Sequence, residues 1–327
     1  MWRLLLVLTA CGRLGFESSG DAAISADATV GDGDWHAVNA ATLPTGRYEL
    51  AMWHAGELEP LTLFGGITAG SITAADDTWS WDGTTWVLRS PAMRPTARTA
   101  AGSYDPVRGQ LVLFGGYNPS GTYVDDTWTW NGTTWIALVS PARPSARVGH
   151  AAVYDAARDR HLVFGGASMP NMFHNDLWAL EPSGWQPVSP TIGPGARANV
   201  AVAYDAERGV VVIFGGGIGG PTLDSTHEYD GTSWIDRTTQ VGPSPRTGAR
   251  MVYDPARRVI VLFGGSTGSV VHDDTWTWDG TTWTELVTPT RPPARAQHGM
   301  AYVPGYGIVL FGGIGTNSVI RGDMWRL

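Results

Sequence analysis

Hydrophobic segments recur along the chain in a fixed order, four to a unit. In each unit a first segment follows an Arg and ends in an aromatic residue, as in RVGHAAVYD at 147–155. A continuous apolar run ending in FGG comes next, as at 110–116, and then TWTW and TTWIAL segments complete the unit. The FGG phrase begins at Phe64, Phe114, Phe164, Phe214, Phe263 and Phe311, at steps of 50, 50, 50, 49 and 48 residues. Such a fixed period predicts a repeat architecture built from short β-strands.

The third and fourth segments crowd tryptophans around a turn, as in DDTWTWNGTTW at 125–135. The Asn131-Gly132 pair predicts a two-residue type I′ hairpin turn, which would set Trp130 opposite Thr133 and Trp128 opposite Trp135. Strand alternation puts Trp128, Trp130 and Trp135 on one face of the sheet. A single four-stranded sheet cannot hide such a face, so the sheet of a neighbouring unit must cover it.

A glycine pair after a hydrophobic strand, followed by two spaced aromatic residues, resembles the kelch repeat. The resemblance covers residues 34–327 in six copies. It implies an all-β fold, a six-bladed β-propeller with four antiparallel strands in each blade.

Residue spacing also predicts how the ring closes. The last Trp of a unit precedes the next unit's Arg by twelve residues each time, and Trp35 precedes Arg47 by the same interval. The chain stops at Leu327, inside a third strand. We therefore expect residues 34–38 to supply the fourth strand of the last blade, which removes exposed sheet edges.

The N-terminal residues MWRLLLVLTACG resemble a bacterial lipoprotein signal. On this resemblance residues 1–10 are a signal peptide, Cys11 carries lipid, and residues 11–33 are a flexible tether to the propeller at 34–327. The alternative is a start site assigned within a longer leader. Lipidation would anchor the protein to a bacterial envelope membrane, and Gly12 after the Cys favours the outer membrane, on either side of it.

Charge and composition exclude several partners and cofactors. The net charge is −8, all 22 basic residues are Arg, and basic runs are missing, so the sequence predicts no nucleic-acid binding. One Cys excludes an internal disulfide or a thiolate metal cluster. Kelch-bearing galactose oxidases use a copper with a Cys–Tyr crosslink. Here the one cysteine, Cys11, belongs to the expected lipoprotein signal, so that crosslink cannot form. We expect no cofactor, no metal and a monomer.

Two charged columns recur at one end of the predicted propeller. The Arg column opens each first strand and comprises Arg47, Arg98, Arg147, Arg197, Arg246 and Arg295. The Asp column opens third strands and comprises Asp77, Asp126, Asp176, Asp274 and Asp323. One interpretation is a ring of Arg–Asp pairs that lock the blades. The other is an Arg-lined funnel that binds a carboxylate, because a guanidinium matches that group.

The loops between second and third strands differ from blade to blade and open at the same end as the Arg column. Loops on a rigid scaffold commonly carry binding residues. The polar and aromatic ligand-binding candidates are Tyr117, Asn118, Tyr123, Asn171, Phe173, His174, His272, Asn317 and Arg321.

Known catalytic motifs do not occur in the sequence. The leading hypothesis is a non-enzymatic binding or scaffold protein that presents its loop face to a glycan or a protein. The alternative resembles bacterial kelch sialate mutarotases, a carbohydrate isomerase with an Arg-lined funnel and His150 or His298 as acid or base. No acidic residue stands out for that role.

Overall fold

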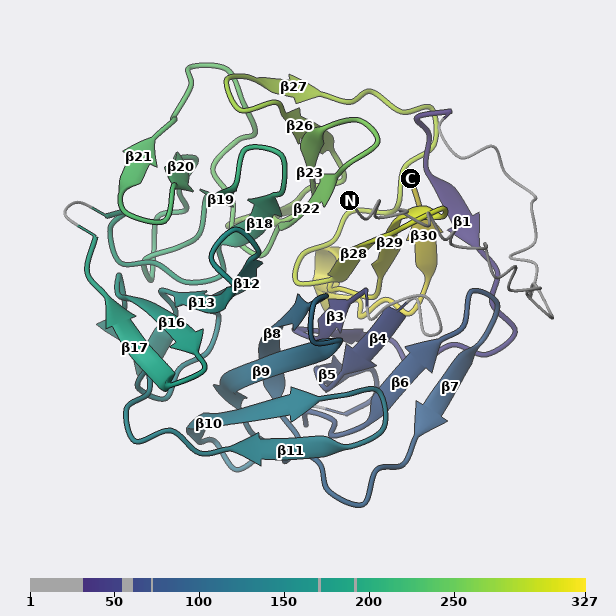
Figure 1. Cartoon of the computed structure of the whole chain (residues 1–327). Coiled ribbons are helices and arrows are strands. Elements are labelled where there is room, and N and C mark those ends of the chain that lie inside the picture. Colours follow the sequence, from purple (N-terminus) through teal and green to yellow (C-terminus); the bar gives the residue numbers. More distant parts are fainter. Residues whose placement is uncertain (1–31, 55–60, 72, 170–171, 191–192) are drawn as a thin grey trace, which may run out of the picture.

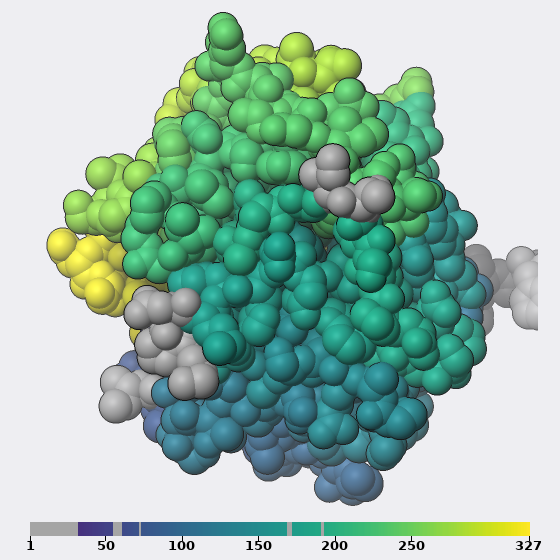
Figure 2. Space-filling view, turned by 90° about the vertical axis from the view of Figure 1, so that its left-hand side faces the viewer, coloured from purple at the N-terminus to yellow at the C-terminus, as the bar shows by residue number. Residues whose placement is uncertain are grey.

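A ring of six four-stranded antiparallel sheets makes up the structure (Figure 1). The computed structural model describes residues 32–54, 61–71, 73–169, 172–190 and 193–327. The first strands of neighbouring blades contact each other around the centre of the ring. From the side, the adjoining blades coloured teal and green lie in direct contact (Figure 2). The structure confirms the all-β, six-bladed propeller that the repeat predicts.

The blades follow chain order, and within each blade the strands lie in sequence order from the centre of the ring outward. Blade one holds β3 (Ala51–Trp53), β4 (Leu61–Phe64), β6 (Thr78–Trp81) and β7 (Trp86–Arg89). Blade two holds β8 (Thr99–Asp105), β9 (Gln110–Tyr117), β10 (Tyr123–Trp130) and β11 (Trp135–Leu138). Blade three holds β12 (Ala151–Asp155), β13 (Arg160–Phe164), β16 (Leu177–Glu181) and β17 (Gly184–Val188).

Blade four holds β18 (Ala201–Asp205), β19 (Val210–Phe214), β20 (Thr226–Tyr229) and β21 (Trp234–Asp236). Blade five holds β22 (Arg250–Asp254), β23 (Val259–Phe263), β26 (Thr275–Trp278) and β27 (Trp283–Glu285). Blade six is the one departure from sequence order, because its outermost strand comes from the front of the chain. It holds β28 (Gly299–Val303), β29 (Gly307–Phe311), β30 (Met324–Arg326) and β1 (His36–Val38).

Short strands in the connections form three two-stranded ladders. These pair β2 (Arg47–Tyr48) with β5 (Ile67–Thr68), β14 (Ala167–Met169) with β15 (Met172–Phe173), and β24 (Ser266–Thr267) with β25 (Val270–Val271). A single 3₁₀ turn spans Thr316–Ser318 in the part of the chain that is described. The described residues contain no helix long and apolar enough to cross a membrane.

The last blade closes with the front of the chain, as the spacing predicts. Strand β1 pairs antiparallel with β30, with Ala37 opposite Trp325, and the purple and yellow ends of the chain meet there in Figure 1. Just before β1, Trp35 is fully buried and its ring stands edge-on to Phe263 of blade five at 5.2 Å. The N-terminal strand is therefore a full member of blade six.

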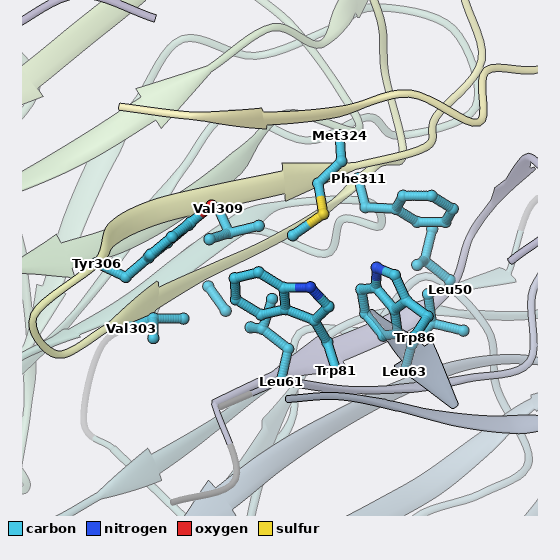
Figure 3. Close-up of a cluster of buried hydrophobic side chains, with 11 residues drawn as sticks. Leu50, Leu61, Leu63, Trp81, Trp86, Val303, Tyr306, Val309, Phe311 and Met324 are labelled. Atoms are coloured by element: carbon cyan, nitrogen blue, oxygen red, sulfur yellow. The ribbon is translucent and has the colours of Figure 1, made fainter. Parts of the chain in front are cut away.

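Tryptophans fill the seams between blades. At the seam of blades six and one, Trp81 and Trp86 lie against Phe311 and Met324 (Figure 3). In four seams the indole Nε1 of the fourth-strand Trp also donates to a Thr hydroxyl of the preceding blade, at 2.9–3.0 Å. These pairs are Trp35–Thr275, Trp135–Thr78, Trp185–Thr127 and Trp283–Thr226.

The remaining two seams show what the Thr does. Met324 and Leu177 stand where the other blades have that Thr. In those seams the Nε1 atoms of Trp86 and Trp234 are buried without a partner among the described residues. An unsatisfied buried donor costs free energy, so in these two seams the indole contributes apolar contact without a hydrogen bond.

The glycine pairs join each blade to the next through the backbone. Gly116 N donates to Arg147 O at 2.9 Å, and the same bond recurs in all six seams, including Gly313 N to Arg47 O at 2.8 Å. A Cβ on the preceding residue, Gly115, would come within 2.9 Å of that Arg carbonyl. Both glycines also have positive φ, which residues with a side chain rarely adopt. Glycine is therefore required here both for its backbone conformation and for the close approach of the next blade.

The outer hairpins correct one prediction. Trp130 pairs with Trp135 and Trp128 with Ala137, so the loop has four residues and is not a two-residue type I′ turn. Asn131 Oδ1 accepts the N–H groups of both Thr133 and Thr134 at 3.0 Å, and this side-chain bonding sets the longer loop. The three indoles still share the face that packs on blade one, as predicted.

We expect Trp35→Ala to destabilise the protein as much as Trp185→Ala does, by about 3–5 kcal/mol each, because both indoles fill equivalent seams. Urea denaturation followed by circular dichroism measures the two losses. The exposed Val139→Ala provides a control that should change little. A Trp35→Ala loss near zero would mean that the N-terminal strand does not close the ring in solution.

Candidate functional site

The Arg column lies inside the propeller wall. Arg147, which is fully buried, donates from Nη1 and Nη2 to the two carboxylate oxygens of Asp176 at 2.6 and 2.9 Å. Its Nη1 also donates to Gly165 O at 2.9 Å and its Nε to Ser145 O at 3.0 Å. The same fork-to-fork pairing joins Arg47 to Asp77, Arg98 to Asp126, Arg246 to Asp274 and Arg295 to Asp323.

The carboxylates of these pairs also receive a tryptophan N–H, as from Trp178 to Asp176 at 2.8 Å. Partial burial raises the pKa of Asp176, but the hydrogen bonds and charge of Arg147 outweigh it and hold the pKa below its usual range. Each pair therefore stays ionised at neutral pH and ties the first, second and third strands of one blade together.

Arg197 is the exception in the column, because Ser225 stands where the other blades have Asp. Its Nη1 donates to Ser225 Oγ at 2.8 Å and to Gly215 O at 3.2 Å, and its side chain is 5% exposed. The column is thus bonded within the wall in all six blades. This geometry supports the interpretation of Arg–Asp locks, and it gives an Arg-lined carboxylate funnel no free guanidinium in this column.

The upper face is the end of the propeller where the Arg column and the loops between second and third strands lie. On blade two, Tyr117 and Tyr123 pair across the end of the β9–β10 hairpin, with their rings edge-to-face at 5.3 Å. Tyr117 is 38% exposed. These two candidates are brought together, and they form one aromatic platform on this face.

The polar loop candidates are engaged within their own loops. Asn118 accepts from Thr122 N, His174 Nε2 bonds Ser168 Oγ at 2.9 Å, and His272 Nε2 bonds Thr267 Oγ1 at 3.0 Å. Partial burial and a neighbouring Arg lower the pKa of His174 and of His272. The two histidines belong to different blades and make no shared site.

The remaining candidates are also accounted for. Arg321 donates from Nε to Ala294 O at 3.2 Å, Asn317 adopts a left-handed φ of 57° in the 3₁₀ turn, and Phe173 is half-buried in β15. Asn171 and Cys11 lie outside the described residues.

Exposed apolar side chains are a further feature of this face, and of them sequence reasoning singled out Tyr117 alone. One large apolar residue in each of five loops between second and third strands is between 38% and 57% exposed; we call this set the apolar crown: Tyr117, Met172, Ile218, Val270 and Val319. A second set lies farther out, in the connections that lead from one blade to the next: Leu43, Met93, Val139, Val241 and Val287.

A ring of backbone hydrogen bonds runs around the central channel near its upper end. The residues two after each column Arg bond to their neighbours in turn: Ala100 N to Glu49 O, Glu49 N to Gln297 O, Gln297 N to Gly248 O, Gly248 N to Asn199 O, and Asn199 N to Gly149 O. A sixth bond, from Gly149 to Ala100, is missing from this described ring.

The break has a cause in the sequence. In blade two, Tyr104 at the end of the first strand follows the column Arg98 by six residues, whereas the equivalent Tyr of blades three to six follows its Arg by seven. The first strand of blade two is therefore continuous, and it lacks the residue with left-handed φ that the other blades have before this strand. That conformation, with φ between 53° and 68°, is adopted by Glu49, Gly149, Asn199, Gly248 and Gln297.

Two charged residues of the channel were missed from the sequence. Glu49 is a ring member whose Oε1 accepts from Gln297 Nε2 at 2.7 Å, and Arg250 donates from Nε to His298 O at 2.9 Å. Burial raises the pKa of Glu49 and lowers the pKa of Arg250, and each charge partly opposes the shift of the other. A comparison of the blades could have identified Arg250 as a candidate, because the equivalent position is Ala or Gly in every other blade.

His150 and His298 are buried, and each stands edge-on to a phenylalanine, Phe114 and Phe263 respectively. Neither ring nitrogen of either residue has a hydrogen bond of standard geometry within the described chain. Burial, reinforced by Arg147, lowers the pKa of His150 to about 3; burial with Arg250 and Arg295 lowers that of His298 well below its usual value. Neutral histidines of this kind are poor general acids at neutral pH. Within the described residues no group of three or more His, Cys, Asp or Glu side chains could hold a metal.

We expect acid to destabilise the protein through these two histidines. They bind protons in the unfolded chain below about pH 6.5 but not in the fold, so stability is lost as pH falls, by about 2 kcal/mol per histidine down to about pH 5. His150→Leu with His298→Leu should reduce that loss, since Leu50 fills the same place in blade one. Urea denaturation at about pH 5 and 7.5 measures the difference, with the part-exposed His36→Gln as control. Equal acid sensitivity in the double variant would show that the buried rings do protonate.

Comparison with known proteins agrees with the geometry of the blades. Residues 129–313, more than half of the chain, match the KLHDC2/KLHL20/DRC7 Kelch-repeats domain. A comparison with curated proteins gives no match. Together with the six four-stranded blades, the match shows that the chain belongs to the kelch-repeat β-propeller family.

Proposed function

We propose that this protein is a non-enzymatic binding protein that docks a protein partner on its upper face. One observation carries the proposal. Of the fifteen large apolar side chains exposed in the described residues, ten lie in the connections at that face, as the apolar crown and the set outside it. Exposed apolar side chains gathered on one face are typical of a protein interaction site.

The chemistry of the face favours a protein over a glycan. Sugar recognition needs several free polar groups beside an aromatic platform, and Asn118, His174 and His272 are already bonded within their own loops. The Tyr117–Tyr123 pair provides one aromatic platform. Apolar and aromatic contacts supported by a rigid scaffold fit the core of a protein interface.

The alternative, a mutarotase-like isomerase, lacks support from the geometry. Its reaction would use free column arginines and a titrating histidine near neutral pH. The column arginines are bonded within the wall, and the pKa of His150 lies at about 3.

The second part of the proposal places the propeller at a bacterial envelope membrane through lipid on Cys11. Its support is the sequence MWRLLLVLTACG, in which an apolar run leads to a Leu-x-Ala-Cys box. A lipid at Cys11 with a flexible tether would leave the upper face able to meet a partner at the membrane.

The docking surface is tested with the triple variant Met172→Ser, Val270→Ser, Val319→Ser. We expect a partner enriched from envelope extract by the wild type to bind this variant more than tenfold more weakly, because each apolar anchor contributes about 1 kcal/mol or more. The matched control, Val87→Ser, Ile136→Ser, Ile235→Ser, changes similarly exposed residues of outer strands and should bind normally. Equal loss in both variants, or binding of the wild type to a glycan array alone, would contradict the proposal.

Anchoring is tested separately with Cys11→Ser. We expect the wild type in the membrane fraction and the variant in the soluble fraction, because the variant lacks the acceptor thiol. Fractionation followed by immunoblotting measures the distribution, and Ser18→Ala in the tether provides the control. Membrane attachment of the Cys11→Ser protein would refute lipidation at this residue.

A further inference from the structure

Below the backbone ring, the central channel is hollow and continuous. A chamber of about 170 Å³ lies next to Arg250, and a wider vestibule of about 520 Å³ opens below it. The two cavities share Met52, Ala152, Met251 and Met300 in their walls, so one space leads into the other. The vestibule is the wider end of the channel, and the tyrosines that line it place it at the lower face, opposite the apolar crown.

The side chains around this space are mostly apolar, and the vestibule wall is mainly apolar, whereas the chamber also exposes polar atoms. The chamber is lined by Ala, Gly, Val, Leu and Met side chains apart from Arg250 and His150. Around the vestibule stands a tyrosine column, with Trp53 beside it: Tyr104, Tyr154, Tyr204, Tyr253 and Tyr302. No Asp, Glu or Arg lines the vestibule in the described part of the chain. A volume of this size with apolar walls and few polar groups is typical of a small-molecule site.

At the deep end, Arg250 uses one of its five N–H donors in a hydrogen bond. Its Nε bonds His298 O, but its Nη1 and Nη2 form no hydrogen bond with the described residues. No described carboxylate oxygen lies within 4.0 Å of it, so Glu49 is a neighbour and not an ion-pair partner. A partly buried cation without an ion-pair partner carries a desolvation cost, and an anion bound at the guanidinium would offset that cost.

Other unpartnered polar groups stand beside Arg250. The break in the backbone ring leaves a polar pocket of about 30 Å³ that Arg250, Asn199, Gly149 and His150 line together. Both nitrogens of His150, which is fully buried, lack hydrogen-bond partners there. The deep end of the channel thus offers donors to a ligand, whereas the lower walls offer mainly apolar and aromatic contact.

We propose that the channel binds an amphipathic monocarboxylate, an acid with a single carboxylate and an apolar body, entering from the lower face. Its carboxylate pairs with Nη1 and Nη2 of Arg250, whose planar fork matches that group. Its apolar body lies along Met52, Met251 and Met300 toward the tyrosine column. A second negative charge on the ligand would meet no other Lys or Arg among the described residues that line the chamber and the vestibule. The site is separate from the upper face, and the proposal does not depend on a partner binding there.

The test is calorimetric titration of the whole protein with octanoate. Octanol and octylammonium keep the chain but change the head group, and acetate keeps the head group without the chain. An octapeptide with a free C-terminus presents the same carboxylate from a macromolecular source. We expect octanoate to bind, and each of the others to bind at least tenfold more weakly. Absence of octanoate binding, equal binding of octanol, or binding of the peptide in preference would overturn the proposal.

Variants separate the two ends of the site. Arg250→Met should weaken octanoate binding by roughly 10- to 100-fold while leaving octanol binding unchanged, since it removes charge-assisted hydrogen bonds. Arg250→Lys should keep part of the affinity, and Arg94→Met, a surface arginine, should keep all of it. Met251→Gln should weaken octanoate but not acetate. Should Arg250→Met fail to fold, the Lys and Gln variants still decide the outcome: unchanged octanoate binding in the Met251→Gln protein would exclude the channel.

Discussion

Each four-stranded sheet can hide its tryptophan face only against the next sheet, and the fold depends on repeating that contact around a closed ring. Toward the rim the contact is an indole that packs on a phenylalanine and donates to a threonine, as Trp185 does with Phe114 and Thr127. Near the centre it is the backbone bond from a glycine to the next column Arg. The two parts need each other, because the glycine bond sets the close spacing that the indole then fills. An open chain of blades would leave one such face exposed to solvent. The pairing of β1 with β30 completes the last blade and closes the ring.

The same seam explains why the most regular charged residues are unavailable to a ligand. A column Arg such as Arg147 contributes its carbonyl to one seam and its guanidinium to Asp176 and Gly165 in its own blade. Removing it would break contacts between three strands and two blades. The side chain of a residue that recurs in every blade is thus bonded within the fold and does not bind a ligand. Arg250 stands at a position where the other blades have Ala or Gly, so the fold does not need its side chain for these contacts.

The sequence predicts the architecture well because spacing along the chain controls it: the fifty-residue period, the Trp-to-Arg interval and the closing strand all follow from counting residues. The hairpin register was wrong because counting does not show that Asn131 captures two backbone N–H groups and lengthens the loop. Arg–Asp pairing stayed undecided because sequence does not show which carboxylate a guanidinium reaches. Arg250 was missed because it occurs in one blade alone and so forms no recurring column. Counting also hid that blade two lacks one residue, since it aligns Gly102 with Ala51 where the strand register aligns Ala101.

That missing residue also links the departure from symmetry to the channel. In the five other blades a residue with left-handed φ turns the chain inward and bonds to its neighbours, a conformation that strains Glu49, Asn199 and Gln297. Blade two omits the turn, and the ring opens there between Ala100 and Gly149. The opening borders His150, whose nitrogens make no hydrogen bond of standard geometry with the described residues, and Arg250, whose guanidinium uses one of its five N–H donors. A sixth copy of the turn would bond Gly149 to its neighbour and fill the space beside both side chains. The polar pocket in the channel therefore exists because the repeat is broken at one blade.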